Sequence, residues 1–118
     1  MENHKLVLPE HLNQFGYLFG GNLLKWVDEF AWMAASLDYH GCHFVTIGLD
    51  KVEFRKSVKG GTILKFNAEK TKTGNSSVQY YVSVYRGNSS SDDRALIFST
   101  NVTFVRIDQE GKKIPLPK

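Results

Sequence analysis

The sequence predicts an α+β domain built from one long helix and one antiparallel sheet. Two patterns predict it: a single stretch of helical composition at 22–39, and later segments whose apolar residues recur at every second position. A chain of 118 residues forms one domain, 1–118, and can bury roughly two thirds of its unfolded surface. Apolar residues make up 42% and charged residues 23%, which excludes wholesale disorder.

The first elements are a strand, a loop and the helix. Residues 4–9 predict a short edge strand that ends at Pro9, and residues 11–21, rich in glycine and asparagine, predict a loop. Alanine and leucine favour helix over 22–39, and Gly41 supplies the stop. Apolar residues occur nearly all round this helix, so we expect it to be buried on most sides.

After Gly41 the apolar period changes to two. It predicts half-buried strands near 45–54, 63–71, 78–85 and 96–105, separated by turns at 60–61 and 73–75 and by an exposed loop at 87–93. Residues 108–118 are polar with two prolines, and we expect an extended tail. A helix that is apolar on most sides needs a sheet curved around it, which is the hotdog arrangement. The long free edges of such a sheet favour pairing with a second copy.

The net charge of +3 is unevenly distributed. Residues 1–50 sum to −4, residues 51–72 to +5 and residues 73–118 to +2. The basic segment is either an anion site or a solvated strand face. The modest total, without basic motifs interleaved with aromatic residues, argues against nucleic-acid binding.

Targeting and redox features are sparse. No apolar run approaches 18 residues and the N-terminus lacks an apolar signal region, so we expect neither membrane partners nor secretion. The single Cys42 forms no internal disulfide, and the histidines lack metal-ligand spacing, so we expect no metal. These features predict a cytoplasmic protein.

Residues 11–28 contain the residues best suited to chemistry. A glycine pair, Gly20-Gly21, followed by Asn22 at a helix start allows close backbone approach of a ligand, and free N–H groups there stabilise developing negative charge. Asp28 lies two turns further along an otherwise apolar helix. It is either exposed beside Glu29 or held in a partly dry site.

The pattern N-x-x-G-x-L-F-G-G-x-L-(x)3-V-D, from Asn13 through Asp28, resembles the hotdog acyl-CoA thioesterases of the acyl-CoA hydrolase family, which includes the short YciA-like bacterial enzymes and the two-domain brain-type enzymes. Segments 45–54, 74–77 and 103–105 extend the resemblance over about residues 5–115.

The resemblance implies hydrolysis of an acyl-CoA thioester to a free acid and CoA, without a metal or organic cofactor. It assigns Asp28 as general base or nucleophile, and Asn13 as a residue contributed from the other subunit. The backbone around Gly20, Gly21 and Asn22 then polarises the thioester carbonyl. It further implies a homo-oligomer, a dimer at least and often a trimer of dimers.

CoA carries phosphates, which lysine, arginine and turn N–H groups bind. The residues that we expect to bind CoA are Arg55, Lys56, Lys59, Gly74, Ser76 and Ser77. Three positions depart from the family pattern: Tyr17 replaces a small or polar residue, Arg55-Lys56 replaces a residue followed by proline, and Gly61 replaces aspartate. They bear on chain-length preference and CoA affinity.

Two further questions stay open from the sequence. The apolar residues of the helix form either core or an acyl tunnel; they are Trp26, Phe30, Trp32 and Met33. The main alternative function is a non-catalytic acyl-CoA sensor, which does not need Asp28. A hotdog dehydratase or hydratase needs a catalytic histidine arrangement that the sequence lacks.

Overall fold

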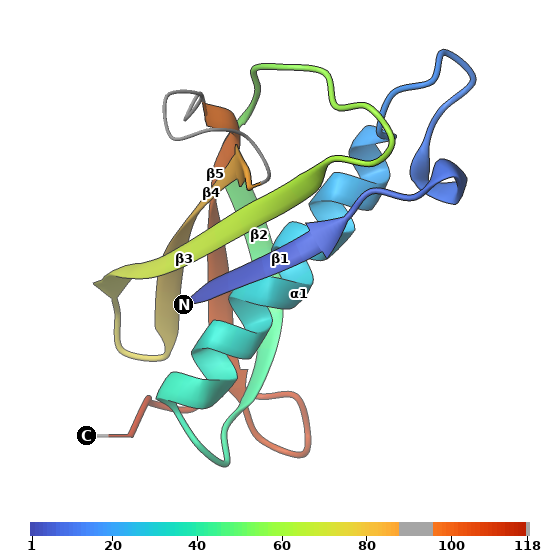
Figure 1. Cartoon of the computed structure of the whole chain (residues 1–118). Coiled ribbons are helices and arrows are strands. Elements are labelled where there is room, and N and C mark those ends of the chain that lie inside the picture. The colour runs from blue at the N-terminus through green and yellow to red at the C-terminus, as the bar shows by residue number, and fades with distance from the viewer. Residues whose placement is uncertain (88–95, 118) are drawn as a thin grey trace.

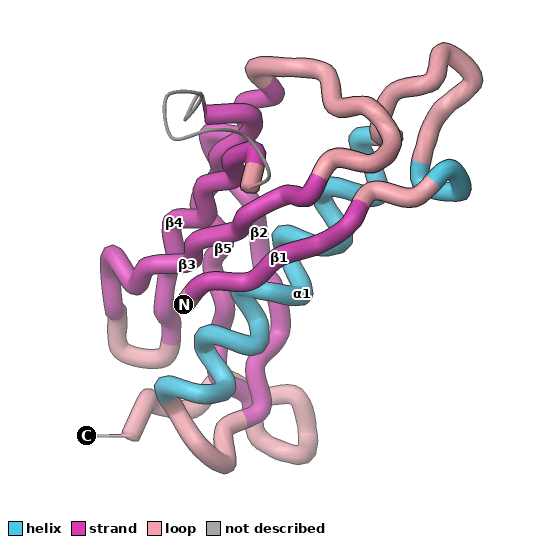
Figure 2. Tube along the Cα trace, viewed as in Figure 1, coloured by secondary structure: helices cyan, strands magenta, loops and turns pink. Residues whose placement is uncertain are grey.

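The computed structural model describes residues 1–87 and 96–117 (Figure 1). Its elements are β1 (Glu2–Leu6), a 3-10 helix (Pro9–His11), α1 (Gly20–Asp38), β2 (His43–Phe54), β3 (Ile63–Thr73), β4 (Ser77–Arg86) and β5 (Leu96–Ile107). The strands form one antiparallel sheet in the order β1-β3-β4-β5-β2, and α1 packs against it (Figures 1 and 2). The predicted α+β fold is confirmed.

Strand alternation places the core between the sheet and α1. Leu64, Phe66 and Ala68 of β3 are buried, as the period of two predicts. The same side of β4 contributes Val78, Tyr80, Val82 and Val84. On β5, Ile97 and Ser99 are buried too, so this inner strand is covered on both faces over part of its length, which alternation alone did not predict.

The helix is buried on one side only. Its buried residues are Leu23, Trp26, Val27, Ala31, Ala34 and Ala35. Trp32 is 43% exposed and Leu37 is 61% exposed. The expectation of burial on most sides is therefore wrong for the single chain, because one sheet covers only the side of α1 that faces it. The side of α1 away from the sheet is open, and there Trp32 lies among the polar residues Lys25 and Glu29.

The edge strand β2 also exposes apolar side chains. Its exposed residues are Val45, Ile47, Val52 and Phe54. β2 pairs only with β5, leaving its other edge without a strand among the described residues. Lys51 has φ +51° within the irregularity of the β2–β5 register between Asp50 and Glu53, so the strand bends there.

Element boundaries differ modestly from the predictions. The first strand covers 2–6 instead of 4–9, and a 3-10 helix forms at Pro9–His11, where the predicted strand ends and the predicted loop begins. The helix begins at Gly20, two residues early, because the Phe19 N–H donates to the His11 carbonyl oxygen and fixes the chain at the helix start.

The C-terminal segment folds back instead of extending. The Ile114 N–H donates to the Arg106 carbonyl at 3.1 Å, and the Leu116 N–H to the Asn75 carbonyl at 2.9 Å. Of the predicted loop at 87–93, only Gly87 lies within the described residues. No helix in the described ranges is long and apolar enough to cross a membrane.

Candidate active site

A tight hairpin before the helix orients Asn13. The side-chain Oδ1 of Asn13 accepts hydrogen bonds from the N–H groups of Phe15 (2.9 Å) and Tyr17 (3.2 Å). Gly16 closes the turn with φ +84°, which favours glycine. Because Oδ1 is used within the hairpin, the Asn13 Nδ2 donor has no partner among the described residues and stays available to a ligand.

The start of α1 lies directly beside this hairpin. Phe19 occupies the N-cap position with extended backbone, and no side chain caps the helix. The N–H groups of Gly20 and Gly21, in the uncapped first turn of α1, are therefore free donors among the described residues. Asn22 differs from them: its N–H donates to the Phe19 carbonyl at 3.0 Å, and its Nδ2 to the His11 carbonyl at 3.1 Å.

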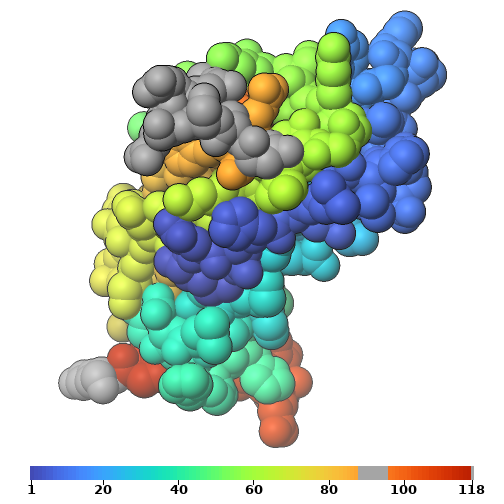
Figure 3. Space-filling view, viewed as in Figure 1, coloured from blue at the N-terminus to red at the C-terminus, as the bar shows by residue number. Residues whose placement is uncertain are grey.

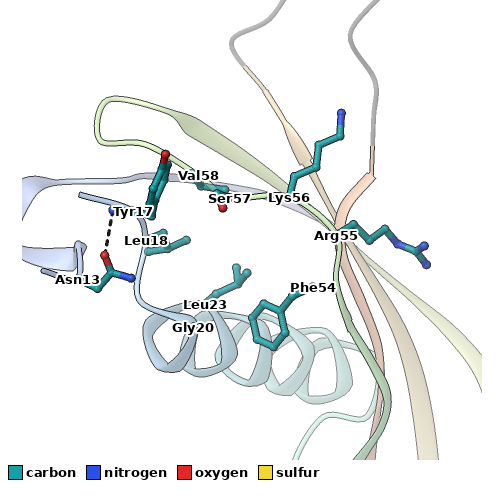
Figure 4. A pocket seen from close by; sticks show the side chains of 10 residues that line it. All are labelled: Asn13, Tyr17, Leu18, Gly20, Leu23, Phe54, Arg55, Lys56, Ser57 and Val58. Atoms are coloured by element: carbon teal, nitrogen blue, oxygen red, sulfur yellow. Dashed lines mark hydrogen bonds between the residues drawn. The ribbon is translucent and has the colours of Figure 1, made fainter. Parts of the chain in front are cut away.

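A cleft of about 310 Å³ opens between these two segments and the β2–β3 connection (Figure 4). Its lining residues are Asn13, Tyr17, Leu18, Gly20, Leu23, Phe54, Arg55, Lys56, Ser57 and Val58. The hairpin is tied to the far wall by the Leu18 N–H, which donates to the Val58 carbonyl at 2.7 Å. A methyl group added at Gly20 would contact the Phe54 ring at 3.4 Å, so this part of the cleft is narrow.

The basic side chains of the cleft point away from it. In Figure 4 the Arg55 and Lys56 side chains extend outward from the strand end. The Arg55 guanidinium donates to Ser99 Oγ at 3.2 Å and lies 3.2 Å from the Glu53 carboxylate. Lys59 is exposed next to the hairpin, where it forms a β-bridge with Tyr17.

Asp28 lies in a second cavity, further along α1. Its side chain is half-buried, and its Oδ1 accepts a hydrogen bond from the Thr46 hydroxyl of β2 at 2.7 Å. The groove around it measures about 720 Å³ and is lined by Lys5, His11, Lys25, Trp26, Asp28, Glu29, Phe30, Trp32 and Met33. Glu29, by contrast, is exposed.

Several groove residues are not core residues. Trp26 is buried, but Trp32 is 43% exposed and Phe30 and Met33 are half-buried. The Trp32 indole donates to the Phe44 carbonyl at 3.1 Å, which fixes its ring beside β2. An apolar groove that begins at a carboxylate suits the tail of an acyl group.

Within one chain Asn13 and Asp28 line different cavities. The eight helical residues from Gly20 to Asp28 advance about 12 Å along the axis of α1. Asn13 lines the cleft at the helix start, whereas Asp28 lines the groove that α1 forms with Lys5 of β1 and with His11. The two polar groups therefore do not meet in the single chain.

The predicted CoA-binding residues also fall into two groups. The β2–β3 connection with Lys56 and the β3–β4 turn with Gly74 lie at opposite ends of β3, a strand of 11 residues and so about 35 Å long. In the space-filling view the green connection and the yellow turn lie apart (Figure 3). The extended strand separates them, so they form no common site in one chain.

The Gly74–Ser77 turn has a structural explanation as well. The Gly74 N–H donates to the Ser77 carbonyl at 2.8 Å, and a methyl group at Gly74 would lie 2.6 Å from Ser77 Oγ. A side chain at position 74 would therefore require the Ser77 hydroxyl to rotate. Ser76 accepts from the Arg106 N–H through its carbonyl at 2.9 Å.

Thr46, whose hydroxyl donates to the Asp28 carboxylate, was given no role by sequence reasoning. The available signal was its place in segment 45–54, which extends the family resemblance. The described residues contain no group of three or more histidine, cysteine, aspartate or glutamate side chains able to hold a metal ion.

Known proteins share both sequence and fold with this chain. The sequence pattern of the thioesterase superfamily matches residues 15–91. An uncharacterized acyl-CoA thioester hydrolase, YkhA, of Bacillus subtilis is 30% identical over 112 residues. The match covers 95% of this chain and 64% of that protein, so the chain spans less than two thirds of that relative's length.

Solved structures agree. An acyl-CoA hydrolase from Staphylococcus aureus, an asparagine-to-alanine mutant in complex with coenzyme A, gives a TM-score of 0.89 at 30% identity over 99% of this chain and 70% of that chain. The hexameric thioesterase y2039 from Yersinia pestis gives a TM-score of 0.89 at 29% identity, covering 98% and 93%. The chain belongs to the thioesterase superfamily.

Proposed function

We propose that this chain hydrolyses acyl-CoA thioesters to a free carboxylic acid and CoA. The observation that carries the proposal is the Asp28 carboxylate, half-buried and bonded to Thr46 Oγ1 in an apolar groove on the helix whose first turn is uncapped. A solvated surface acid needs neither feature. A base and an oxyanion hole suffice for a thioester, because the thiolate leaves readily.

The proposed reaction uses water and no cofactor. As general base, Asp28 takes a proton while the water oxygen bonds to the carbonyl carbon; the C–S bond then breaks and CoA leaves as a thiolate that takes up a proton. As nucleophile, Asp28 instead attacks the carbonyl carbon and CoA leaves as a thiolate that takes up a proton; water then hydrolyses the resulting anhydride to the free acid and the Asp28 carboxylate. The Thr46 hydroxyl keeps the carboxylate oriented in either route, and the carbonyl oxygen is stabilised by the N–H groups of Gly20 and Gly21.

Asn13 supplies the second donor in this proposal. Support comes from its free Nδ2 and from the structures of the Staphylococcus aureus hydrolase, which include variants with an asparagine, an aspartate or a threonine replaced by alanine. The replaced asparagine and aspartate of that enzyme are separated by as many residues as Asn13 and Asp28. Asn22, whose donors are used within the chain, serves here to hold the helix start.

The proposed site is completed by a second copy of the chain. Support comes from the open edge and exposed apolar residues of β2, from the uncovered side of α1, and from the separation of Asn13 and Asp28. Similar enzymes are hexameric. We infer at least a dimer, with Asn13 of one subunit facing Asp28 of the other, and a trimer of dimers as the larger assembly.

CoA binding follows the same proposal. Lys56 and Lys59, with Arg55, bind phosphate groups beside the cleft, and the Gly74, Ser76 and Ser77 turn of another subunit adds N–H and hydroxyl donors. To bind a phosphate group, Arg55 must break its ion pair with Glu53. The lone free Cys42 suits the reducing cytoplasm that we propose as the compartment.

The test is release of free thiol from acyl-CoAs of increasing chain length by the wild type and by Asp28→Ala. We expect the wild type to release CoA and the variant to lose about a hundredfold to ten-thousandfold in kcat. The variant should keep its melting temperature, since Asp28 is outside the core. The length profile then defines the acyl group that the groove accepts.

Two outcomes contradict the proposal differently. If the wild type binds acyl-CoA without releasing thiol, the chain is an acyl-CoA sensor and Asp28 is structural. If the wild type releases thiol but Asp28→Ala does so equally, hydrolysis stands and the assigned base is wrong.

A further inference from the structure

His11 joins the N-terminal loop to the start of α1, yet the proposed reaction gives it no role. Its Nδ1 accepts a hydrogen bond from the Leu8 N–H at 2.9 Å. Its carbonyl oxygen accepts two more, from the Phe19 N–H at 2.9 Å and from Asn22 Nδ2 at 3.1 Å. The His11 carbonyl oxygen therefore binds both the N-cap residue, Phe19, and the side chain of Asn22 in the first turn of α1.

The imidazole is fixed on its other side by Trp26. The two rings meet edge to face, with centroids 4.8 Å apart and planes at 86°. Trp26 is only 6% exposed, so it forms a rigid wall in the second turn of α1. The His11 ring thus lies between the 3-10 turn and the helix, where its movement would displace the carbonyl that orients the helix start.

The Leu8 contact requires an unprotonated Nδ1. A backbone N–H donates into the Nδ1 lone pair, so the neutral ring carries its proton on Nε2. An imidazolium has N–H on both nitrogens and cannot accept this bond. Protonation would place two donors face to face and release the ring from Leu8.

Charges of both signs face the ring. Lys5 of β1 has its Nζ 5.3 Å from the Trp26 ring centroid, and Lys25, Asp28 and Glu29 of α1 line the same groove. Glu10 precedes His11 in the 3-10 helix.

We propose that His11 is a positioning residue for the thioesterase reaction. Its neutral imidazole accepts the Leu8 N–H and packs on Trp26, and this fixes the position of the His11 carbonyl oxygen. That oxygen binds Phe19 and Asn22, and these contacts set the direction of the Gly20 and Gly21 N–H groups. The inference rests on the proposed function, because those two groups are the donors assigned to the thioester oxygen. It also makes the site sensitive to acid.

The test compares His11→Asn with His11→Gln and His11→Ala. Asparagine places Oδ1 as many bonds from Cα as Nδ1, so it can accept the Leu8 bond and cannot be protonated there. Glutamine places its oxygen one bond further and has similar polarity. At about pH 8 we expect His11→Asn to keep kcat within about threefold, and the other two to lose about tenfold to a hundredfold in kcat with little change in KM.

The pH profile supplies a readout that a purely structural residue would not move. Thioester absorbance follows the reaction from about pH 5 to about pH 8, where imidazoles ordinarily titrate. We expect kcat of the wild type to fall more steeply toward acid than kcat of His11→Asn, which retains only the titration of the carboxylate base. Coinciding profiles overturn the proposal, as does equal activity of the asparagine and glutamine variants.

Amide hydrogen exchange over residues 8–23 separates this inference from the proposed function. We expect faster exchange in His11→Gln than in His11→Asn, whether or not CoA is released. If the wild type lacks activity but the exchange difference is present, the proposed function fails and the anchoring by His11 stands. If the wild type is active and exchange is equal in the two variants, the anchoring is wrong.

Discussion

The two cavities beside α1 differ in the chemistry that they offer. The cleft at the helix start is walled by loops and presents donors: the Asn13 Nδ2 and the N–H groups of an uncapped first turn. The groove further along the helix is larger, about 720 Å³ against 310 Å³, and combines apolar side chains with the Asp28 carboxylate. Thus one cavity can stabilise an oxyanion and the other can hold an acyl tail and activate water.

Neither cavity is sufficient for hydrolysis alone. An oxyanion hole without a base leaves the nucleophile weak, and a base without donors leaves the tetrahedral oxygen unstabilised. The division becomes productive when two copies align the cleft of one with the groove of the other. The uncovered side of α1 and the exposed apolar residues of the β2 edge are the surfaces that such pairing would bury.

The largest effect should come from mixing two inactive variants. Asn13→Ala and Asp28→Ala each remove one half of the site, so each alone should have little activity. Refolded together, half of the dimers are mixed, and each mixed dimer keeps one intact site out of two. We expect activity to recover to about a quarter of wild type, as two-fold symmetry requires.

The control is each variant refolded by itself at the same total concentration. Recovery only in the mixture requires Asn13 and Asp28 to act from different chains. If the mixture shows only the mean of the separate activities, both residues act within one chain, and the comparison between the two cavities loses its meaning.

The sequence predicted the fold better than it predicted the site. Alternation located β3, β4 and β5, because their apolar residues face one helix and the period of two survives in the folded sheet. It misjudged the helix: apolar residues all round α1 predict burial all round, but Trp32 and Leu37 are exposed in the single chain. The sequence shows which residues of a helix are apolar, but it does not show whether the same chain or another molecule covers them.

Among the candidate site residues, those close together in sequence were easier to predict than those that meet only in the folded chain. Gly20 was singled out because a helix start is local in sequence, and Asn13 because the pattern from Asn13 through Asp28 resembles the acyl-CoA hydrolase family; the two residues line the same cleft. Thr46 belongs to the family-like segment 45–54, but its contact with Asp28 was not predicted, because it joins two elements whose register no local pattern fixes. The predicted CoA residues were grouped by charge and turn chemistry, and β3 separates them in space.

A moderate effect is expected at Thr46. Replacement by valine keeps the side-chain shape and strand propensity but removes the 2.7 Å bond to Asp28. Loss of about one hydrogen bond should lower kcat/KM about threefold to tenfold. Thr46→Ser retains the hydroxyl and should stay near wild type. If serine and valine lower kcat/KM equally, the methyl group and not the hydroxyl supports the carboxylate.

The smallest effect on catalysis is expected at the other end of α1, which serves as a reference region. The Tyr80 hydroxyl, on a side chain only 1% exposed, donates to Asp38 Oδ2 at 2.5 Å. Asp38 is the last residue of the helix, where a carboxylate opposes the helix dipole. The bond offsets that cost and ties the helix end to β4.

Tyr80→Phe should therefore lower the free energy of unfolding by about 1 kcal/mol and leave kcat unchanged. Burial, and then Asp38, raises the pKa of Tyr80 far above its usual value near 10. The neutral phenol is thus favoured by folding, so its contribution is full below about pH 10 and is lost as pH rises above that. Denaturant titrations should show the difference between wild type and Tyr80→Phe shrinking from about pH 9 upward. A constant difference, or a fall in kcat at neutral pH, would show that this end of the helix is coupled to the two cavities after all.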